Sequence, residues 1–428
     1  MNRIFAVLVV ILALSGIVTA PAGANYLEVT APGNQTIRLA VARPVPLGGP
    51  SLATTAQELA DVFAFDLTLA GPFTVLPAPP ADNGTGVRSG EFAFGPWQAA
   101  GADLLLKAGY SVSGTTLVVE CRLFDVVKQR ELTVKRFTGN TRDLRWMAHS
   151  ISDEILRVVT GRKGPFTGKI AFVSTATGTK EIYLMDYDGR NVQRLTKNQS
   201  INLTPDFSPS GRELIYTSYQ KGTPDLYRRD IPSGVESRLT ANRGTNIGGT
   251  WAPDGNSIAV SMSQSGNAEI YLLNRDGKQL QKLTNSPAID ISPTWSPDGK
   301  QLAFVSDRFG KPQVFVMNSN GNDVRRLTTN GAYNVSPRWS PNGDRIAYCR
   351  QTAEGFQIFA INPDGSNDIQ LTFAGSNEHP RWSPDGRFIT FSSNRSGKMA
   401  LYVMRADGRS QTEVMRSTSN NTHPVWSP

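Results

Sequence analysis

Cysteine is scarce in this chain, with only two residues in 428. A fold held together by several disulfides is therefore excluded. Cys121 lies in the apolar stretch TLVVECRLF, on the same side of a predicted strand as Leu117, Val119 and Leu123. Cys349 ends a second apolar stretch. We interpret both thiols as core residues, because a free cysteine behaves as a small apolar side chain.

Sequence motifs for catalysis are also missing. The chain has no G-x-S-x-G, P-loop, H-E-x-x-H or G-x-G-x-x-G sequence, which excludes the common hydrolase, nucleotide-binding and zinc-peptidase signatures. It has three histidines: His149, and His379 and His423, which each stand one residue before a proline. Two imidazoles without a third ligand make a weak metal site. We therefore predict no catalytic residue, no metal and no cofactor.

Charged residues are absent from one long stretch at the beginning of the chain. Arg3 precedes the apolar run Ile4–Val18, and Ala22-Gly23-Ala24 follows it as a cleavage sequence. This pattern predicts a secretory signal peptide over residues 1–24 and an exported protein that begins at Asn25. A membrane anchor is the alternative, but the apolar run is short for a spanning helix. No cysteine follows the cleavage sequence, so a lipoprotein is not expected.

One sequence motif is repeated many times along the chain. An aromatic residue recurs at intervals of 44, 44, 44, 43 and 44 residues, at Phe207, Trp251, Trp295, Trp339, Trp382 and Trp426. A Leu-Thr pair recurs 44 residues apart, beginning at Leu195, Leu239, Leu283, Leu327 and Leu371. A period of about 40–45 residues with short apolar runs predicts a β-propeller.

Each repeat predicts four strands, here called A to D. The stretch PTWSPDGKQLAFVSDR at 293–308 contains strands A and B, joined by a Ser-Pro-Asp-Gly turn with a fixed proline φ and a flexible glycine. Strand C carries Ile-Tyr pairs and is followed by Asp-Gly, a strong hairpin signal; strand D ends at Leu-Thr. We interpret the aromatic residue of strand A as packing between neighbouring blades.

The first repeat has no strand A before it, and the last segment, Thr422–Pro428, is a strand A with no strand B after it. Joined together, they complete one blade. The sequence therefore predicts six blades, closed by the C-terminal strand on Ile170–Ser174, which removes two sheet edges. The repeats lack the paired GH and WD motifs of a WD40 array.

The part before the repeats predicts a small α/β domain with a mixed sheet and helices. The expected elements are, in chain order, a strand at Ile37–Ala42, a helix at Thr54–Ala70, strands at Phe73–Leu76, Leu104–Ser111, Thr116–Asp125 and Glu131–Phe137, and a helix that is capped by Asp143 and runs to Val159. The chain thus divides into a signal peptide (1–24), an arm (25–37), the α/β domain (38–161), a hinge (162–167) and the all-β propeller (168–428).

The net charge of +8 resides in the propeller, where residues 162–428 hold 31 Lys and Arg against 23 Asp and Glu. Many of the basic residues lie beside Leu-Thr on strand D, such as Arg194 and Arg238. Because strand D is the outer edge of each blade, these charges discourage edge-to-edge pairing. An acidic partner or the anionic cell envelope is the alternative interpretation. Nucleic acid is not expected, since the charges follow the repeat around the rim.

A ring of short polar side chains precedes strand A in every repeat. Its members are Asn202, Asn246, Asp290, Asn334, Asn377 and Asn421. The repeat places them on one face, in the D–A loops around the central channel. One interpretation is local, since Asn and Asp hold their own loop backbone in Asx turns. The other is a polar channel mouth that recognises a partner or a cation.

The order of these parts, with PxWSPDGxxIAFxS repeats closed by the C-terminus and the helix RDLRWMAHSISDEILRVVTGRKGPF leading into KIAFVS, resembles the TolB family, the periplasmic component of the Tol–Pal system. The resemblance implies a non-enzymatic scaffold that supports outer-membrane integrity and envelope constriction at cell division. It implies a periplasmic monomer that reaches membranes only through its partners.

Two partner sites follow from the resemblance. The arm would bind the C-terminal domain of the inner-membrane protein TolA, through Tyr26, Leu27, Glu28, Val29 and Thr30. The channel mouth would bind Pal, a peptidoglycan-associated lipoprotein, through Thr245, Asn246, Gly248 and Ile291, with the rest of the Asn/Asp ring, His379 and His423 beside them. The third blade departs from the repeat, since its loop GTNIGGTW lacks the usual proline.

Two other function classes remain open from the sequence. One is a propeller enzyme, either a metal-dependent lyase that uses His379 and His423 or a relative of peptidase propellers. The other is a glycan-binding module at the channel mouth. The family resemblance also implies that the arm is either ordered against its own protein or released, with Pal binding biasing the choice.

Overall fold

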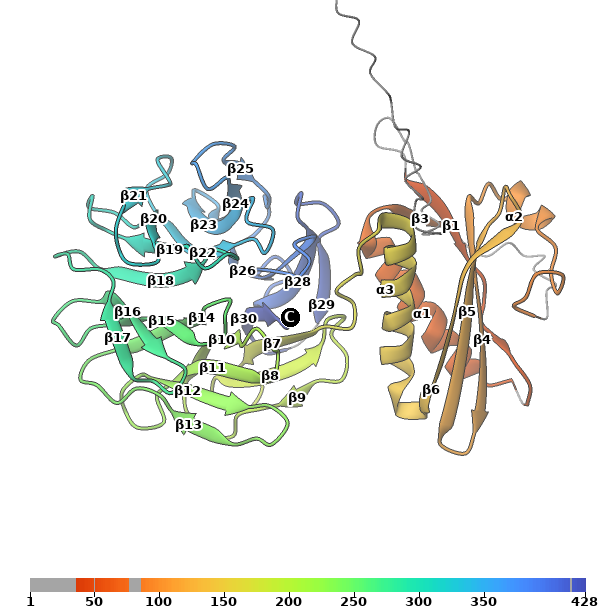
Figure 1. The fold of residues 1–428 in the computed structure, drawn as a ribbon, viewed down its shortest axis with the longest axis horizontal. Helices are drawn as coiled ribbons and strands as arrows, with labels where there is room; N and C mark the ends of the chain where they lie inside the picture. The colour runs from red at the N-terminus through yellow and green to blue at the C-terminus, as the bar shows by residue number, and fades with distance from the viewer. Residues whose placement is uncertain (1–35, 50, 77–85, 416–417) are drawn as a thin grey trace, which may run out of the picture.

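A computed structural model describes residues 36–49, 51–76, 86–415 and 418–428, which form two domains side by side (Figure 1). The predicted signal peptide and residues 25–35 of the predicted arm lie outside the described residues. Ile37, the last residue assigned to the arm, is the first residue of β1 and pairs with Phe73. None of the described helices combines the length and apolarity needed to cross a membrane.

The first domain is built on a six-stranded sheet in the order β3-β1-β4-β5-β6, with β2 beside β4. Its strands are β1 (Ile37–Val41), β2 (Val45–Pro46), β3 (Phe73–Leu76), β4 (Leu104–Ser113), β5 (Thr116–Asp125) and β6 (Arg130–Asn140). The strand β1 runs parallel to β3 and β4, whereas β4, β5 and β6 are antiparallel. The sheet is therefore mixed, as the sequence predicts.

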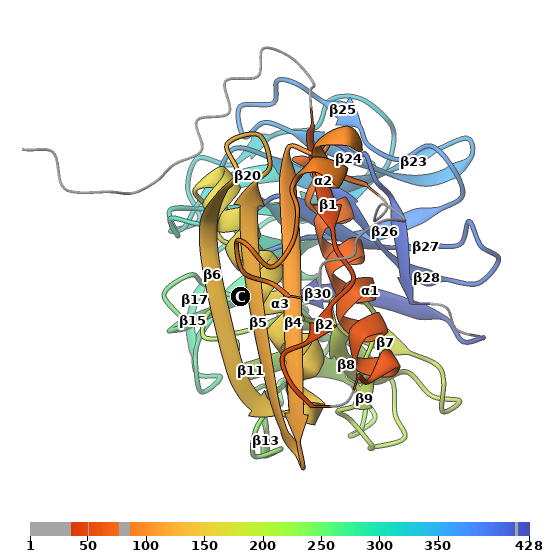
Figure 2. The ribbon, with the colours of Figure 1, turned by 90° about the vertical axis from the view of Figure 1, so that its right-hand side faces the viewer.

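Two long helices cover the face of this sheet that is turned toward the propeller (Figures 1 and 2). They are α1 (Ala53–Ala70) and α3 (Leu144–Thr160); the short α2 (Gly95–Ala99) and the 3-10 turn η1 (Thr141–Asp143) complete the domain. The capping role predicted for Asp143 on the last helix is wrong. Its carboxylate instead accepts the backbone N–H of Asn140, whose own side chain accepts the N–H of Arg142, and this reciprocal pair caps η1.

The second domain consists of six four-stranded sheets arranged as blades around a channel (Figure 1). The A strands are β30 (Asn421–Trp426), β10 (Asn202–Phe207), β14 (Asn246–Trp251), β18 (Asp290–Trp295), β22 (Asn334–Trp339) and β26 (Asn377–Trp382) for blades 1 to 6. The B strands are β7 (Lys169–Ser174), β11 (Glu213–Ser218), β15 (Ser257–Met262), β19 (Gln301–Ser306), β23 (Ile346–Thr352) and β27 (Phe388–Ser393).

The two outer strands of each blade follow in the same order. The C strands are β8 (Glu181–Asp186), β12 (Asp225–Asp230), β16 (Glu269–Asn274), β20 (Gln313–Asn318), β24 (Gly355–Ile361) and β28 (Ala400–Arg405). The D strands are β9 (Gln193–Arg194), β13 (Glu236–Arg238), β17 (Gln279–Lys282), β21 (Arg325–Arg326), β25 (Ile369–Gln370) and β29 (Thr412–Met415). Every sheet has the order A-B-C-D, so the predicted fold class is confirmed.

The C-terminal strand closes the ring. In blade 1, β30 pairs antiparallel with β7, and Trp426 stands opposite Ile170. The backbone N–H of Ser427 donates to the carbonyl of Lys169 at 2.8 Å, and the N–H of Lys169 donates to the Ser427 hydroxyl at 2.9 Å. The two chain segments that the sequence leaves incomplete therefore form one blade.

The aromatic residue of strand A packs between blades, as predicted. Trp382, for example, belongs to a buried cluster with Ala347 and Ile358 of blade 5 and Ile389 and Phe391 of blade 6. The two cysteines are buried free thiols. Strand B is buried along most of its length because it lies between two neighbouring sheets, which explains its continuous rather than alternating apolar sequence.

The two domains share one apolar core at one end of the propeller. Leu156 of α3 and Phe166 belong to the same buried cluster as Tyr187, Phe388 and Trp426 of blades 1 and 6. The rings of Tyr187 and Trp426 stack with centroids 5.5 Å apart. These propeller residues stand beside the A–B and C–D turns. We call this side of the propeller the turn end, and the opposite side, formed by the D–A and B–C loops, the mouth.

Candidate functional site: the propeller channel and its two ends

Every strand A carries a β-bulge that shapes the channel wall. The pairing between strands A and B shifts within strand A in all six blades. The third residue of each strand A has a positive φ, between 49° and 68°, namely Thr204, Gly248, Ser292, Ser336, His379 and His423. Blade 3 has Gly248-Gly249 where the other blades have a residue followed by proline. Glycine adopts this backbone conformation without the steric cost that a side chain imposes.

The predicted Asn/Asp ring opens the six A strands at the mouth, and all six side chains are fully buried. Four of them donate a hydrogen bond to a side chain of the previous blade, and we call this inter-blade bond the latch. The Nδ2 of Asn202 donates to Glu181 Oε2 at 3.1 Å, and Thr196 of the Leu-Thr pair donates to the same carboxylate. The corresponding bond from Asn246 to Asp225 Oδ1 is 3.0 Å long. These side chains hold the loops together and do not face solvent.

The same hydrogen bond is found at the seams that precede blades 5 and 6, but within the described part of the chain it is missing at the positions of Asp290 and Asn421. Asn334 and Asn377 donate to Gln313 and Gln357 at 2.8 and 2.9 Å. Asp290 has no N–H to donate and instead accepts from Arg308 Nη2 at 2.9 Å.

The seam between blades 6 and 1 is the second exception. The first residue of its strand C is Ala400, which offers no acceptor, and both polar side-chain atoms of Asn421 lack a hydrogen-bond partner within the described residues. Among the described residues, four of the six seams therefore have this buried side-chain latch at the mouth. The Asp290–Arg308 bond lies within blade 4, and the seam between blades 6 and 1 has no such bond.

The mouth loops present apolar side chains to solvent. Ile201, Ile289 and Tyr333 each precede a strand A and are 44, 48 and 38% exposed. Phe309 of the B–C loop of blade 4 is 67% exposed, and Phe373 of the D–A loop between blades 5 and 6 is 69% exposed. Contiguous apolar patches on a protein are typical of protein-binding surfaces, and we call the loops that carry these five side chains the mouth surface.

The mouth residues suggested by the family resemblance lie within this surface. Thr245 is exposed and donates to Ser263 Oγ at 3.1 Å. Ile291 is partly exposed, whereas Asn246 is buried in the latch. Gly248 belongs to the bulge of blade 3, and a Cβ atom added to it would meet no atom beyond its own chain neighbours within 4 Å. The suggested arm residues, Tyr26 to Thr30, lie outside the described part of the chain.

His379 and His423 stand on neighbouring A strands, and their rings stack with centroids 3.6 Å apart. Burial and the positive charges of Arg338, Arg381 and Lys180 lower the pKa of His379 to about 3. Burial and the neighbouring His379 also lower the pKa of His423. The described residues offer no group of three or more His, Cys, Asp or Glu that would hold a metal ion. The positive surroundings that oppose a proton oppose a metal cation equally.

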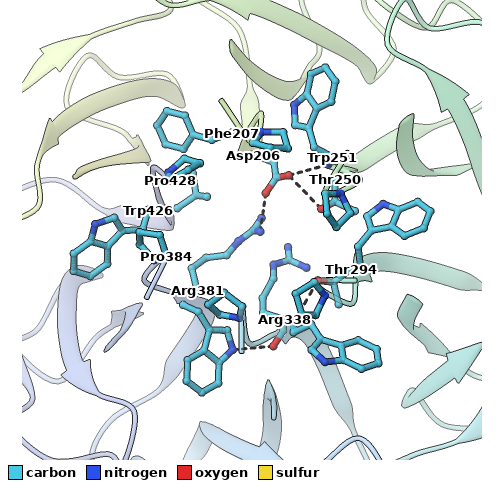
Figure 3. A pocket seen from close by; sticks show the side chains of 18 of the residues that line it. Asp206, Phe207, Thr250, Trp251, Thr294, Arg338, Arg381, Pro384, Trp426 and Pro428 are labelled. Carbon is cyan, nitrogen blue, oxygen red and sulfur yellow. Dashed lines mark hydrogen bonds and ion pairs between the residues drawn. The ribbon is translucent and has the colours of Figure 1, made fainter. Parts of the chain in front are cut away.

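Deeper in the channel, the fifth residue of each strand A faces the axis. These residues are Asp206, Thr250, Thr294, Arg338, Arg381 and Val425, and they line a cavity of about 380 Å³. Figure 3 shows the guanidinium of Arg381 reaching toward Asp206 and that of Arg338 pointing into the space between the blades. The prolines and aromatic residues of the A–B turns surround the cavity at the turn end.

A polar cluster that the sequence analysis missed joins the two domains beside this end. His149 Nδ1 lies 2.9 Å from Asp66 Oδ2, and its Nε2 lies 3.5 Å from Asp188 Oδ2. The hydroxyl of Tyr187 donates to Asp66, and Arg145 pairs with Asp188. Burial alone lowers the pKa of His149, but the two carboxylates outweigh it and raise the pKa to about 10. The imidazole is therefore protonated at neutral pH.

The chain matches two protein-family models. One, described as the TolB beta propeller domain, matches residues 156–428, and one described as the TolB amino-terminal domain matches residues 25–132. A Tol-Pal system protein TolB from Geobacter sulfurreducens is 57% identical over 216 residues, which are 50% of this chain and 49% of that protein. One from Geobacter metallireducens is 55% identical over 190 residues, 44% of each. The chain spans about half the length of the curated relatives it matches.

Solved structures give a longer match. The crystal structure of TolB from Acinetobacter baumannii superposes with a TM-score of 0.81 at 26% identity and covers 92% of this chain and 97% of that one. A nidogen/laminin complex superposes with a TM-score of 0.52 at 12% identity, which indicates a shared propeller fold alone.

Proposed function

The chain belongs to the TolB family, and we propose that it is a non-enzymatic, protein-binding scaffold of the Tol–Pal system in the periplasm. In this role it links the inner-membrane protein TolA to the outer-membrane lipoprotein Pal. It thereby supports outer-membrane integrity and constriction of the envelope during division.

The exposed apolar side chains of the mouth carry this proposal. Ile289, Tyr333 and Phe373 are 48, 38 and 69% exposed, on loops that hydrogen bonds hold in place. An apolar centre on preformed loops is the usual composition of a protein-binding surface. The first domain packs at the turn end, so the mouth is the side of the channel on which a folded partner has room to dock.

Within the mouth, we assign different roles to the suggested residues. Thr245 and Ile291 have solvent-accessible side chains and are proposed to touch Pal directly. Asn246 and the other ring members are buried, so we propose that they fix the loop shape. His379 and His423 lie in the channel just below and form the floor of the same surface.

The arm is proposed as the second partner site, for the C-terminal domain of TolA. An extended segment binds by adding a strand to a sheet edge, where main-chain hydrogen bonds supply affinity. Pal at the mouth would bias the arm between an ordered and a released state, which requires that Pal bind the two states with different affinity.

The His pair gives little support to a propeller enzyme. A metal-dependent lyase would need further ligands beside His379 and His423, and the neighbouring cationic groups are Arg338, Arg381 and Lys180. The apolar mouth likewise favours a protein over a glycan, since glycan sites rely on exposed polar groups around a stacking surface.

Binding to the soluble domain of the host's Pal-like lipoprotein tests the mouth. The mature protein should bind it, and the double variant Ile289→Arg/Tyr333→Arg should bind at least about tenfold more weakly, since it places charge in an apolar contact. Val235→Arg is the matched control, because Val235 is 66% exposed on the C–D turn of blade 2 at the other end. Equal affinity in the two variants would refute this surface.

The arm is tested separately with the TolA C-terminal domain. Deletion of residues 25–35 should abolish that interaction and leave a measurable affinity for Pal. If the deletion variant retains full TolA binding, the assignment of the arm fails while the mouth assignment stands.

A further inference from the structure

The channel holds an uneven set of charges. Of the six residues that face its axis at the fifth position of strand A, two are arginines, Arg338 and Arg381, and one is an acid, Asp206. The other three are Thr250, Thr294 and Val425. Among these six side chains, the guanidinium groups therefore outnumber the carboxylates by one.

Asp206 already accepts three hydrogen bonds, none of them from the second arginine. Its Oδ1 accepts from Arg381 Nη1 at 2.8 Å across the channel. Its Oδ2 accepts from the Thr250 hydroxyl at 3.2 Å and from the backbone N–H of Trp251 at 3.0 Å. The Arg381–Asp206 pair is thus neutral and hydrogen-bonded to a third blade.

Arg338 forms no ion pair among the described residues, although the charge of Asp206 acts on it from a distance. Its Nη1 donates to the carbonyl of Pro337 at 2.8 Å, which leaves further N–H groups of the guanidinium directed into the cavity (Figure 3). Burial and the nearby positive charge of Arg381 lower the pKa of Arg338 below its ordinary value. A guanidinium in a confined site is destabilising unless an anion neutralises it.

The space in front of Arg338 suits a small molecule. The cavity has a volume of about 380 Å³, and its wall at the turn end is formed by prolines and by the aromatic residues of the A strands. An apolar wall with one or two convergent charged groups is typical of sites for small ligands. The planar fork of a guanidinium matches the oxygens of a carboxylate or a phosphate.

We propose that the turn-end cavity of the channel binds a small oxyanion, a carboxylate or a phosphate, through Arg338, with the Arg381–Asp206 pair beside it. This site lies deeper in the channel than the mouth and does not depend on the partner surface there. The ligand supplies the negative charge that would pair with the Arg338 guanidinium.

Calorimetric titration of the mature protein with acetate and, separately, with inorganic phosphate tests the site, with chloride at matched ionic strength as reference. At least one oxyanion should bind where chloride does not, and comparison of the two identifies the class. Arg338→Gln should weaken that binding about tenfold or more, the equivalent of one charged hydrogen bond. Arg243→Gln is the matched control, because Arg243 is exposed on a mouth loop.

Thermal unfolding shows whether a loss of anion binding in Arg338→Gln comes from a misfolded variant. Arg338→Gln removes an unpaired charge from a confined site, so its midpoint without anion should equal or exceed that of the wild type. Added oxyanion should raise the midpoint of the wild type and of Arg243→Gln only. Binding of neither anion above chloride, or equal binding by Arg338→Gln and wild type, overturns the proposal.

Discussion

Replacement of His149 by Gln is expected to weaken the joint between the two domains, by an amount that depends on pH. His149 is 2% exposed and stands between Asp66 of α1 and Asp188 of blade 1. Its Nδ1 contacts Asp66 Oδ2 at 2.9 Å, and Tyr187 donates to the same carboxylate. One protonated imidazole therefore neutralises acidic groups from both domains.

The direction of the pH effect follows from the raised pKa. Burial lowers the pKa of His149, but the carboxylates of Asp66 and Asp188 raise it by more, and the result is about 10 against 6.5 for an ordinary histidine. The contribution of protonated His149 to the free energy of unfolding is fully present below pH 6.5 and is lost as the pH rises toward 10. Since one pKa unit corresponds to about 1.4 kcal/mol, the free energy of unfolding should fall by roughly 2 kcal/mol between pH 7 and 9.

The His149→Gln variant removes the charge but keeps a side chain that can donate to Asp66. At pH 7 it leaves a buried carboxylate without its cation, which typically costs about 3 kcal/mol. Because glutamine does not titrate, the loss of stability between pH 7 and 9 should disappear in this variant. The wild type and the variant should therefore converge as the pH rises.

Urea unfolding at pH 7, 8 and 9 measures this difference. The midpoint of the wild type should fall over the series, and that of His149→Gln should start lower and stay nearly constant. His423→Gln is the control, because burial lowers the pKa of His423 and keeps it neutral throughout this range. A wild-type midpoint that does not change with pH, or a fall that persists in His149→Gln, refutes the protonated joint.

Three further predictions concern the seams and the core. Asn246→Ala should lower the free energy of unfolding by about 1–3 kcal/mol, since it leaves Asp225 short of a buried donor. Asn421→Ala should change it little, because the Asn421 side chain lacks partners among the described residues. Equal urea midpoints for the two variants would contradict the latch. Gly189→Ala should be more destabilising than Gly178→Ala in thermal unfolding, because a Cβ at Gly189 would stand 1.7 Å from the carbonyl oxygen of Val414 and one at Gly178 meets nothing within 4 Å, although both have φ near +85°. Burial raises the pKa of the Cys349 thiol to about 12 and also raises that of Cys121. A thiol reagent should therefore label neither cysteine in the native protein at pH 8 and both in urea. Rapid labelling of the native protein would show that these strands open easily.

Much of the fold could be predicted because its signals are local. The repeat spacing, the Ser-Pro-Asp-Gly turns and the unfinished blades at the two ends determine the number of blades and the closure. In the first domain, turn residues bound the strands so clearly that Phe73–Leu76 and Thr116–Asp125 agree residue for residue with β3 and β5. The short elements β2 and α2 were not predicted, because two- and five-residue elements depend on the neighbours they pack against.

The sites were less predictable because their partners are distant in sequence. The sequence places Asn202 and its equivalents at one end of the propeller, which is correct, but their burial depends on acceptors 20 or 21 residues earlier on another blade. A signal was available there, since the residue before each Ile-Tyr-like pair is Glu, Asp or Gln in five repeats and Ala400 in the sixth. His149, Asp66 and Tyr187 meet over separations of 83 and 121 residues. Only the polar residues within the apolar faces of α1 and α3 indicated such a cluster.

The seam between blades 6 and 1 connects the two ends of the channel in a way that no other seam does. It carries the joint to the first domain through Tyr187, Phe388 and Trp426. At the mouth it has no buried latch among the described residues, since strand C of blade 6 begins with Ala400 and both polar side-chain atoms of Asn421 lack a partner. A partner at the mouth can influence the first domain only if it favours one arrangement of an element that both ends share. We propose that the blade 6–blade 1 seam is this shared element, because small changes in its packing break fewer buried hydrogen bonds than at the four latched seams and act directly on the residues that hold the first domain.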